Sequence, residues 1–335
     1  MSPFLLTRTL PEDAAGAALR ADVLHGLSRT PKSLPPKWFY DARGSALFDE
    51  ITTLPEYYPT RAEREILVAR AAEIAAATGA RTLVELGSGS SEKTRHLIDA
   101  MESLHTYVPV DVSESALTGA ANTLIAERPA LDVHALIADF TRGLALPGTP
   151  GPRLVAFLGG TIGNLLPAER AAFLTSVRGL LSPGDALLLG TDLVKEEGVL
   201  VAAYDDATGV TAAFNKNVLH VINRELGADF DPDAFAHVAV WDRDHEWIEM
   251  RLRSRSAQTV KIPALDLAVH FAAGEELRTE ISAKFREEVV KSELAAADLS
   301  LTHLVDGRAG PLRAVPEHGG RSLRPAVVST EPGAP

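Results

Sequence analysis

Five short apolar runs recur between residues 81 and 190, separated by stretches rich in Ala, Leu and Glu. Strands that are apolar on both faces and separated by helical crossovers are typical of a parallel sheet with helices on both sides. The alternation therefore predicts an α/β fold built on a Rossmann-like sheet. The runs cover residues 81–84, 107–110, 133–138, 154–159 and 186–190.

The first run leads into a glycine-rich string, Glu85-Leu86-Gly87-Ser88-Gly89-Ser90-Ser91-Glu92, and then into a helix-like segment. Glycine lets the backbone approach a ligand closely, and a helix N-terminus favours anionic or hydroxyl-rich groups. The string thus indicates a nucleotide-like cofactor, although a lone Gly-x-Gly after a strand also occurs as a simple tight turn. Glu85 suits a cationic or hydroxyl-bearing cofactor, and Ser91 replaces the third glycine of the dinucleotide fingerprint.

Polar residues follow the other runs, where ligands bind in an open α/β sheet. Asp111 lies 22 residues after Gly89, close to the spacing at which a second-strand acid accepts hydrogen bonds from ribose hydroxyls. Asp192 is more simply interpreted as a solvated loop residue or a helix N-cap. The remaining strand-end residues are Asp139, Phe140 and the string from Gly159 to Asn164.

Composition limits the classes of function. The chain has no cysteine, and its 10 histidines form no spaced cluster, so no metal site is expected. A formal charge of −12 argues against nucleic-acid binding, because that needs Lys and Arg against phosphates. No apolar run approaches the roughly 20 residues needed to cross a bilayer. We therefore expect a cytoplasmic protein that binds a small molecule and no membrane, and a monomer, since no dimer helix stands out.

The pattern also predicts the domain organisation. Thr60 and Glu63 form a capping-box pattern that predicts a helix over 61–78. From Lys195 the alternation stops, and strand-like runs predict a smaller α+β insertion that completes a substrate cleft. The predicted parts are an N-terminal helical or lid segment packing on the main domain (1–60), a cofactor-binding domain (61–195), the substrate insertion (196–285), a return to the main domain (286–308) and a disordered tail (309–335).

Several strings together carry a family resemblance. Glu85-Leu86-Gly87-Ser88-Gly89, Pro109-Val110-Asp111-Val112-Ser113 and Asp139-Phe140 look like the cofactor site of a class I S-adenosylmethionine methyltransferase. The sequence further resembles the L-histidine Nα-methyltransferases of ergothioneine biosynthesis from about residue 15 to residue 305. That second resemblance is carried by the strings at 35–41, 54–61, 190–195, 204–206 and 213–215.

The resemblance implies transfer of three methyl groups from S-adenosylmethionine to the α-amino nitrogen of L-histidine, giving hercynine. Carried over by position, the cofactor contacts are Gly87, Lys93, Asp111, Asp139 and Phe140. The substrate contacts are Tyr57, Asn164, Tyr204, Glu280, Ile281 and Ser282.

Side-chain chemistry fits these roles. Asp111 can accept from two ribose hydroxyls, Asp139 from the adenine amino group, and Phe140 can pack on the ring. Asn164 and Tyr204 are neutral donors for an α-carboxylate. The two nitrogens of an imidazole can be satisfied by Glu280 and Ser282.

Structural alternatives stay open for three of these residues. Tyr57 could simply fill a core, and Glu280 could be an outward-facing strand carboxylate. Lys93, expected in a first helical turn, opposes the helix dipole, which favours a ligand role.

For catalysis we expect Tyr40 and Asn164 to orient the amine, with Tyr40 and Phe48 as an aromatic wall for the forming quaternary ammonium. One alternative function is an N-methyltransferase acting on another amino acid or amine, such as a tryptophan derivative. A more remote one is a non-catalytic, cofactor-binding partner protein.

Overall fold

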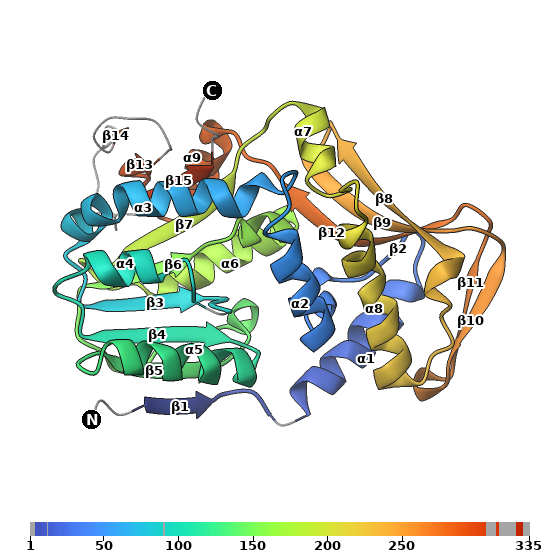
Figure 1. Ribbon diagram of the computed structural model, residues 1–335, viewed down its shortest axis with the longest axis horizontal. Coiled ribbons are helices and arrows are strands. Elements are labelled where there is room, and N and C mark those ends of the chain that lie inside the picture. Colours follow the sequence, from blue (N-terminus) through green and yellow to red (C-terminus); the bar gives the residue numbers. More distant parts are fainter. Residues whose placement is uncertain (1–3, 12, 90, 306–312, 315–325, 331–335) are drawn as a thin grey trace. The chain divides into compact units, whose positions relative to one another are not determined.

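The computed structural model describes residues 4–11, 13–89, 91–305, 313–314 and 326–330, and the chain divides into two compact units. Unit 1 contains residues 1–11, 59–193 and 285–335, and unit 2 contains residues 12–58 and 194–284. The chain therefore leaves unit 1 twice and returns to it twice. Figure 1 shows the elements of both units along the sequence.

Unit 1 is built on a sheet whose strands are almost all parallel. The order is β1-β5-β4-β3-β6-β7-β15-β13-β14, and only β14 runs antiparallel to its neighbour. Strand order reverses direction at β3, which pairs with β4 on one side and β6 on the other. The strands are β1 (Phe4–Arg8), β3 (Thr82–Leu86), β4 (Thr106–Asp111), β5 (Asp132–Ile137), β6 (Arg153–Phe157), β7 (Ala186–Asp192), β13 (His303–Val305), β14 (Arg313–Ala314) and β15 (Ala326–Thr330).

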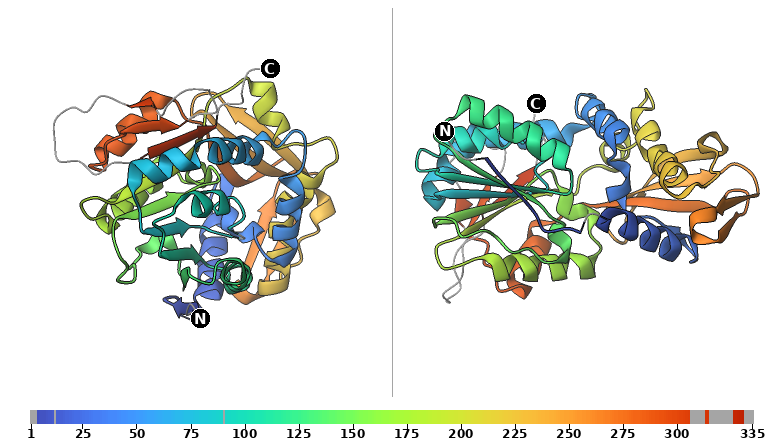
Figure 2. Two further views of the ribbon diagram at one scale, coloured as in Figure 1. Left: turned by 60° about the vertical axis from the view of Figure 1, so that its left-hand side comes forward. Right: turned by 90° about the horizontal axis from the view of Figure 1, so that it is seen from below.

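Helices cover both faces of this sheet, as the apolar strands require. Figure 2 shows α3 and α5 on one face and α6 and α9 on the other. Ile66 and Leu67 of α3 and Leu124 of α5 are buried in one core with strand residues such as Leu83. The predicted α/β class with a parallel sheet is therefore confirmed. The helices of unit 1 are α3 (Tyr58–Thr78), α4 (Arg95–Ala100), α5 (Glu114–Glu127), α6 (Pro167–Leu180) and α9 (Glu287–Ala296), with 3₁₀ turns η2 (Phe140–Arg142) and η3 (Thr161–Asn164).

Unit 2 is an α+β structure with an antiparallel centre, as predicted. The sheet order is β2-β12-β9-β8, and β10 pairs with β11 in a separate hairpin. The strands are β2 (Lys32–Ser33), β8 (Phe235–Asp242), β9 (Trp247–Ser254), β10 (Gln258–Ile262), β11 (Leu267–Phe271) and β12 (Glu276–Ala283). The helices are α1 (Ala14–Leu27), α2 (Ala42–Ile51), α7 (Glu197–Ala202) and α8 (Val210–Leu226), with 3₁₀ turns η1 (Pro36–Phe39), η4 (Pro232–Ala234) and η5 (Pro263–Leu265).

The N-terminal segment differs from expectation. Only β1 joins the main sheet, where it pairs with β5, while residues 12–58 belong to unit 2. The reason is a shared core: Leu19, Val23 and Phe39 are buried with Val218 of α8. An amphipathic pattern shows that a helix has an apolar face but not which core receives it.

The C-terminal tail also differs in part. The prediction of disorder from residue 309 is wrong for residues 326–330, which form β15 between β7 and β13, and for residues 313–314, which form β14. The other residues of this predicted tail lie outside the described residues. A segment without clear apolar periodicity can still form a strand, because the neighbouring strands supply partners for its backbone hydrogen bonds.

Candidate active site

The glycine loop leaves β3 in backbone conformations that favour glycine. Gly87 has φ +69° and Gly89 has φ +50°, both in the left-handed region. A Cβ atom at Gly87 would meet only the Phe140 ring, at 3.4 Å, and nothing lies within 4 Å of one at Gly89. The prediction that the loop runs directly into a helix N-terminus is wrong, because the next helix, α4, begins only at Arg95.

Asp111 is the carboxylate that the structure brings to this loop. It ends β4, and its Oδ2 accepts the Gly89 N–H at 3.0 Å while its Oδ1 accepts the Ser113 N–H at 2.9 Å. Backbone amides thus fix the carboxylate in one orientation beside the glycines. The spacing of 22 residues in the sequence corresponds to this contact.

Asp139 and Phe140 follow β5 at the same end of the sheet. Asp139 Oδ1 accepts from the Thr141 N–H at 3.0 Å and hydroxyl at 2.5 Å and so caps the turn η2. The Phe140 ring packs edge-on against Phe157, with ring centroids 5.3 Å apart. The ring next to Gly87 is therefore held by core aromatic side chains.

These residues fit the adenosine part of S-adenosylmethionine. The Ser88 hydroxyl in the loop is buried and has no hydrogen-bond partner among the residues that the structure describes. Buried polar atoms are nearly always paired, so this one is suited to a ligand. A fixed carboxylate, open glycines and an aromatic ring complete a set of groups that ribose and adenine can use.

The prediction that the charge of Glu85 selects the cofactor is wrong. It is 5% exposed, and its two carboxylate oxygens accept from the hydroxyls of Thr94 and Tyr107. Burial raises the pKa of Glu85 to about 7, against the lowering effect of those two hydrogen bonds. Glu85 therefore supports the loop from beneath, and its charge gives no information on the cofactor.

Lys93, expected in the first turn of a helix, instead precedes α4, which begins at Arg95. Its ammonium forms an ion pair with the Glu63 carboxylate. Glu63 is 2% exposed and also accepts the Gly159 N–H at 2.7 Å through Oε1. The predicted capping box is wrong, because α3 begins at Tyr58 and Thr60 lies inside it. Glu63 instead joins α3 to the segments after β3 and β6. A cofactor contact of Lys93 stays a prediction.

Two further strand-end residues of unit 1 have contrasting positions. Asn164 closes the turn η3 after β6 and is half-buried. Asp192, expected as a solvated residue or N-cap, is instead the buried last residue of β7, and its carbonyl accepts the Phe285 N–H at 2.7 Å. The structure thus uses Asp192 where the chain re-enters the main sheet.

Unit 2 gathers the predicted aromatic residues into one cluster. Tyr40 and Phe48 meet edge-on with ring centroids 5.6 Å apart, and Phe48 and Tyr57 at 6.1 Å. Tyr57 in turn meets Tyr204 at 6.3 Å. Sequence analysis missed Phe214 of α8, whose ring centroid lies 5.4 Å from that of Tyr40. Its position in the string Ala213-Phe214-Asn215, used only for the resemblance, was the available signal.

The Tyr40 hydroxyl is not suited to act as a base. Desolvation of the hydroxyl raises the pKa of Tyr40 above the usual range, although the residue as a whole is 47% exposed, and the charges of Glu280 and Tyr204 act in the same direction. The neutral phenol is therefore the form present near pH 7.

Strand β12 places Glu280 and Ser282 on the same side, because side chains alternate along a strand. Lys284 follows directly after the last residue of β12 and reaches the same side, where it contacts Ser282. Ile281 points to the opposite side. Ser282 Oγ lies 2.7 Å from the Tyr204 hydroxyl, and Lys284 Nζ donates to both oxygens, at 2.8 and 2.9 Å. Sequence analysis missed Lys284, which is 4% exposed, although strand alternation from Ser282 could have found it.

A buried polar chain supports Tyr204 from behind. The register of β12 shifts between Arg278 and Glu280, and the Thr279 hydroxyl at this bulge donates to Asn215 Oδ1 at 2.6 Å. Asn215 donates in turn to His237 Nδ1 at 2.8 Å, and His237 Nε2 donates to the Tyr204 carbonyl at 2.8 Å. Burial lowers the pKa of His237, which fits this neutral form.

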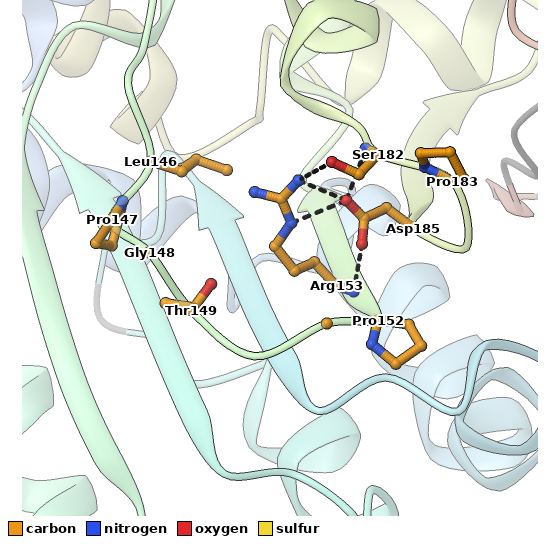
Figure 3. Close-up of a pocket in the computed structure, with 10 residues that line it drawn as sticks. Leu146, Pro147, Gly148, Thr149, Pro152, Arg153, Ser182, Pro183 and Asp185 are labelled. Atoms are coloured by element: carbon orange, nitrogen blue, oxygen red, sulfur yellow. Dashed lines mark hydrogen bonds and ion pairs between the residues drawn. The ribbon is translucent and has the colours of Figure 1, made fainter.

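A surface pocket of unit 1 lies away from the glycine loop. It is lined by the segments that precede β6 and β7, including Pro147, Gly148 and Pro183, and Figure 3 shows Arg153 bound to Asp185 across it. These segments enter the strands, whereas the glycine loop leaves one, so the pocket is at the opposite end of the sheet. Arg153 Nη2 and Asp185 Oδ2 are 2.6 Å apart, a pair that joins the two segments.

The described part of the chain forms neither a candidate metal centre nor a helix suited to span a membrane. Its residues contain no group of three or more His, Cys, Asp or Glu side chains placed to hold a metal ion. Within the same residues, no helix has the length and apolar character needed to cross a membrane.

Comparison with known proteins identifies the family. A family profile described as "Histidine-specific methyltransferase, SAM-dependent" matches residues 19–310. The histidine N-alpha-methyltransferase of Mycolicibacterium smegmatis is 60% identical over 301 residues, which cover 89% of this chain and 94% of that protein. The protein of the same name from Mycobacterium tuberculosis is 59% identical, over 87% and 91%. A 4-dimethylallyltryptophan N-methyltransferase of Penicillium roqueforti is 30% identical, over 66% and 70%. The chain belongs to the S-adenosylmethionine-dependent, histidine-specific methyltransferases.

Proposed function

We propose that the protein transfers three methyl groups from S-adenosylmethionine to the α-amino nitrogen of L-histidine and releases hercynine, the first step of ergothioneine biosynthesis. The observation that carries this proposal is the set of groups on one side of β12, where Glu280 lies in line with Ser282, and Ser282 is bonded to Tyr204. An acceptor-only carboxylate and a hydroxyl on one strand side suit the two nitrogens of an imidazole.

Unit 1 holds the methyl donor in this proposal. When bound, S-adenosylmethionine supplies an electrophilic methyl group on a sulfonium. Asp111, fixed by the Gly89 and Ser113 amides, takes the ribose hydroxyls, and Phe140 packs on the adenine while Asp139 accepts its amino group. Gly87 leaves room beside the Phe140 ring, and Lys93 is assigned to the same site.

Within unit 2, Tyr204 is assigned to donate to the α-carboxylate of the acceptor, while Tyr57 and the strand segment at Ile281 complete the contacts of this unit. Within unit 1, Asn164 is assigned a donor role towards the substrate. Because Tyr40 stays protonated, it orients the amine and does not deprotonate it. Positioning alone can supply a large part of the rate enhancement, with effective molarities of about 10⁵ M or more.

The aromatic rings of unit 2 suit the growing positive charge of the product. Each methylation makes the nitrogen bulkier, and the third fixes a permanent cation. Aromatic faces attract such a cation by roughly 0.5–2 kcal/mol. Tyr40, Phe48 and Phe214, with centroids 5.4–5.8 Å apart, form this wall.

Mass spectrometry of L-histidine incubated with the full chain and S-adenosylmethionine tests the function. We expect successive mass gains of one, two and three methyl groups on the α-amino nitrogen. Calorimetric titration of histidine in the presence of S-adenosylhomocysteine is the second measurement. Absence of both methylated histidine and binding heat would refute the proposal, and binding heat without products would favour a non-catalytic partner protein.

A tryptophan derivative is the second candidate substrate, favoured by the 30% identical 4-dimethylallyltryptophan N-methyltransferase. The polar pair of Glu280 and Ser282 argues against it, because an indole has one N–H and no second ring nitrogen to satisfy them. Competition of histidine with tryptophan and 4-dimethylallyltryptophan in one reaction compares the three substrates directly.

Partners and location are part of the same proposal. We assign the protein to the cytoplasm as a monomer without a resident metal, nucleic-acid or membrane partner. Its net charge of −12 disfavours binding to phosphates. Light scattering on the eluted protein tests the monomer, and unchanged activity after dialysis against a chelator tests metal independence.

A further inference from the structure

Glu63 is a buried acid on the apolar face of α3. It lies at helical spacing from Ile66, Leu67 and Ile74, which are buried in the core of unit 1, and it is 2% exposed. A buried carboxylate is costly unless it is paired, and a buried ion pair is often no more stabilising than the apolar residues that could replace it. An acid on this face of α3 therefore points to a role besides stability.

Both carboxylate oxygens of Glu63 have partners. Oε1 accepts the Gly159 N–H at 2.7 Å, and Oε2 accepts from the Lys93 ammonium. The direction of both hydrogen bonds is fixed, because a backbone N–H and an ammonium only donate. Gly190 of β7 leaves room for the carboxylate, since a Cβ atom there would lie 2.6 Å from Oε1. The carboxylate thus joins α3 to the segments that follow β3 and β6.

Lys93 is the accessible member of this group. Its side chain is 25% exposed, against 2% for the side chain of Glu63. Its Nζ atom would lie 3.5 Å from a Cβ atom at Gly159, so the ammonium is beside the segment that follows β6. An ammonium has three N–H groups, and within the described residues only Glu63 accepts from this one. The ammonium can therefore still donate to a ligand.

The strand order places Lys93 where the amino-acid part of the cofactor is expected. The adenosine part is assigned to Asp111, Asp139 and Phe140, at the ends of β4 and β5 on one side of β3. Strand β6 lies on the other side of β3. S-adenosylmethionine carries its only anionic group, a carboxylate, at the end remote from the adenine. A cofactor that extends from β4 across β3 to β6 brings this carboxylate towards a cation, which attracts it.

We propose that Glu63 is a positioning residue for the cofactor, which holds the Lys93 ammonium in place for the carboxylate of S-adenosylmethionine. The inference rests on the proposed assignment of Lys93 to the cofactor site. A lysine side chain loses much conformational freedom when it is fixed. Because Glu63 fixes it before the cofactor binds, the cofactor meets a group that is already in place, and its affinity rises.

The charge of Glu63 acts in the opposite direction. A carboxylate near the cofactor carboxylate repels it, so removal of this charge alone would strengthen binding. Glu63, however, is buried and bonded to two donors, whereas Lys93 is accessible to a ligand. We therefore expect the positioning effect to dominate, and the sign of the measured change distinguishes the two effects.

Calorimetry of the full chain with two ligands tests the inference. S-adenosylhomocysteine carries the carboxylate, and its decarboxylated analogue differs only in lacking this group. We expect the wild-type chain to bind the analogue about 10–100-fold more weakly, the loss of one charge-assisted hydrogen bond.

Glu63→Gln keeps the shape of the side chain but has one oxygen in place of two, so it cannot hold both Gly159 and Lys93 as the carboxylate does. This variant should bind S-adenosylhomocysteine about tenfold more weakly than wild type and the analogue within about twofold. Glu63→Asp keeps the charge but is one methylene shorter, and it should show the same selective loss. Glu65→Gln, the same substitution at an exposed position of α3, is the matched control.

A double variant shows whether Glu63 acts through Lys93. Lys93→Met should lower the affinity for S-adenosylhomocysteine about 10–100-fold. The addition of Glu63→Gln to Lys93→Met should then change this affinity by less than about twofold, because the group that Glu63 positions is already absent. Two independent losses that add in the double variant would contradict the inference.

The other outcomes separate the inference from the proposed function. Equal losses for both ligands in the Glu63 variants show a structural role and overturn the inference, as does an unchanged or stronger affinity of Glu63→Gln for S-adenosylhomocysteine. Unchanged binding in Lys93→Met refutes the proposed contact of Lys93 and the inference with it. Trimethylated histidine in the mass spectrum leaves the proposed function standing in each of these cases.

Discussion

The two units build their candidate binding residues in opposite ways. In unit 1 the backbone positions them: Gly89 and Ser113 amides orient Asp111, and Thr141 fixes Asp139, each within a few residues of a strand end. In unit 2 side chains from distant segments position one another, as in the triangle of Tyr204, Ser282 and Lys284. A site fixed by local backbone geometry therefore leaves a motif in the sequence, whereas a site fixed by side-chain networks does not.

The contrast extends to charge. Unit 1 buries Glu85 under its loop with a pKa raised to about 7, chiefly by burial. In unit 2, Asp206 lies after Tyr204 and accepts from the Thr208 hydroxyl at 2.6 Å and from the backbone N–H groups of Thr208, Val210 and Thr211 at 2.7–3.1 Å. Although burial acts to raise it, these hydrogen bonds hold the pKa of Asp206 well below its usual range. Unit 1 thus contains a buried acid, Glu85, whose ionisation is disfavoured, and unit 2 contains an acid, Asp206, whose protonation is disfavoured.

The largest expected effect is on the donor site of unit 1. Asp111→Ala removes the ribose acceptor and the fixed contacts to Gly89 and Ser113, and we expect S-adenosylhomocysteine affinity to fall about 10²–10⁴-fold, from two charge-assisted hydrogen bonds. Calorimetry measures this. Glu102→Ala, an exposed acid between α4 and β4, is the control. An affinity within about threefold of wild type would remove Asp111 from the cofactor site.

The next effect tests whether unit 2 acts on the acceptor alone. Glu280→Gln turns a carboxylate acceptor into an amide, and we expect kcat/KM for histidine to fall about 10–100-fold, the loss of one charged hydrogen bond. S-adenosylhomocysteine affinity should stay unchanged. If both fall together, the division of labour between the units is wrong.

The two buried acids predict opposite pH dependence of stability. Because the folded pKa of Glu85 is above its unfolded value, its contribution is fully present below about pH 4.5 and is lost as pH rises towards about 7, a change on the order of 2–3 kcal/mol. The folded pKa of Asp206 is depressed, so its contribution is present above about pH 4 and lost as pH falls further.

Denaturant unfolding of Glu85→Gln and Asp206→Asn across pH measures both effects. Glu85→Gln should flatten the stability profile between about pH 4.5 and about pH 7, and Asp206→Asn should flatten it only below about pH 4. Parallel profiles for wild type and Glu85→Gln would show that Glu85 ionises normally. The same result for Asp206→Asn would do so for Asp206.

The smallest expected effect concerns the Glu63 link in unit 1. A Cβ atom at Gly190 of β7 would lie 2.6 Å from Glu63 Oε1, so Gly190→Ala should destabilise the protein by about 1–3 kcal/mol. Gly119→Ala in α5, where nothing lies within 4 Å, is the matched control and should stabilise it by about 0.4–1 kcal/mol. Equal effects of the two substitutions would mean that Glu63 moves away freely.

Much of this architecture could be predicted from the sequence. Apolar runs on either side of the glycine loop determine the parallel sheet, and the spacing from Gly89 to Asp111 identifies their contact, because both depend on local periodicity and short turns. The family resemblance singled out Tyr57, Tyr204 and Ser282, and the expected chemistry of a quaternary ammonium singled out Tyr40 and Phe48. The structure brings these residues together within unit 2.

Only the tertiary structure decided the rest. Glu63 pairs with Lys93, α1 and α2 join the core of unit 2, residues 326–330 become a strand inside the main sheet, and Lys284 donates to Tyr204. Each of these depends on partners far apart in the chain. A charge or an apolar face shows in the sequence that a partner is required, but the partner is chosen by packing, through the total free energy of burial and hydrogen bonding.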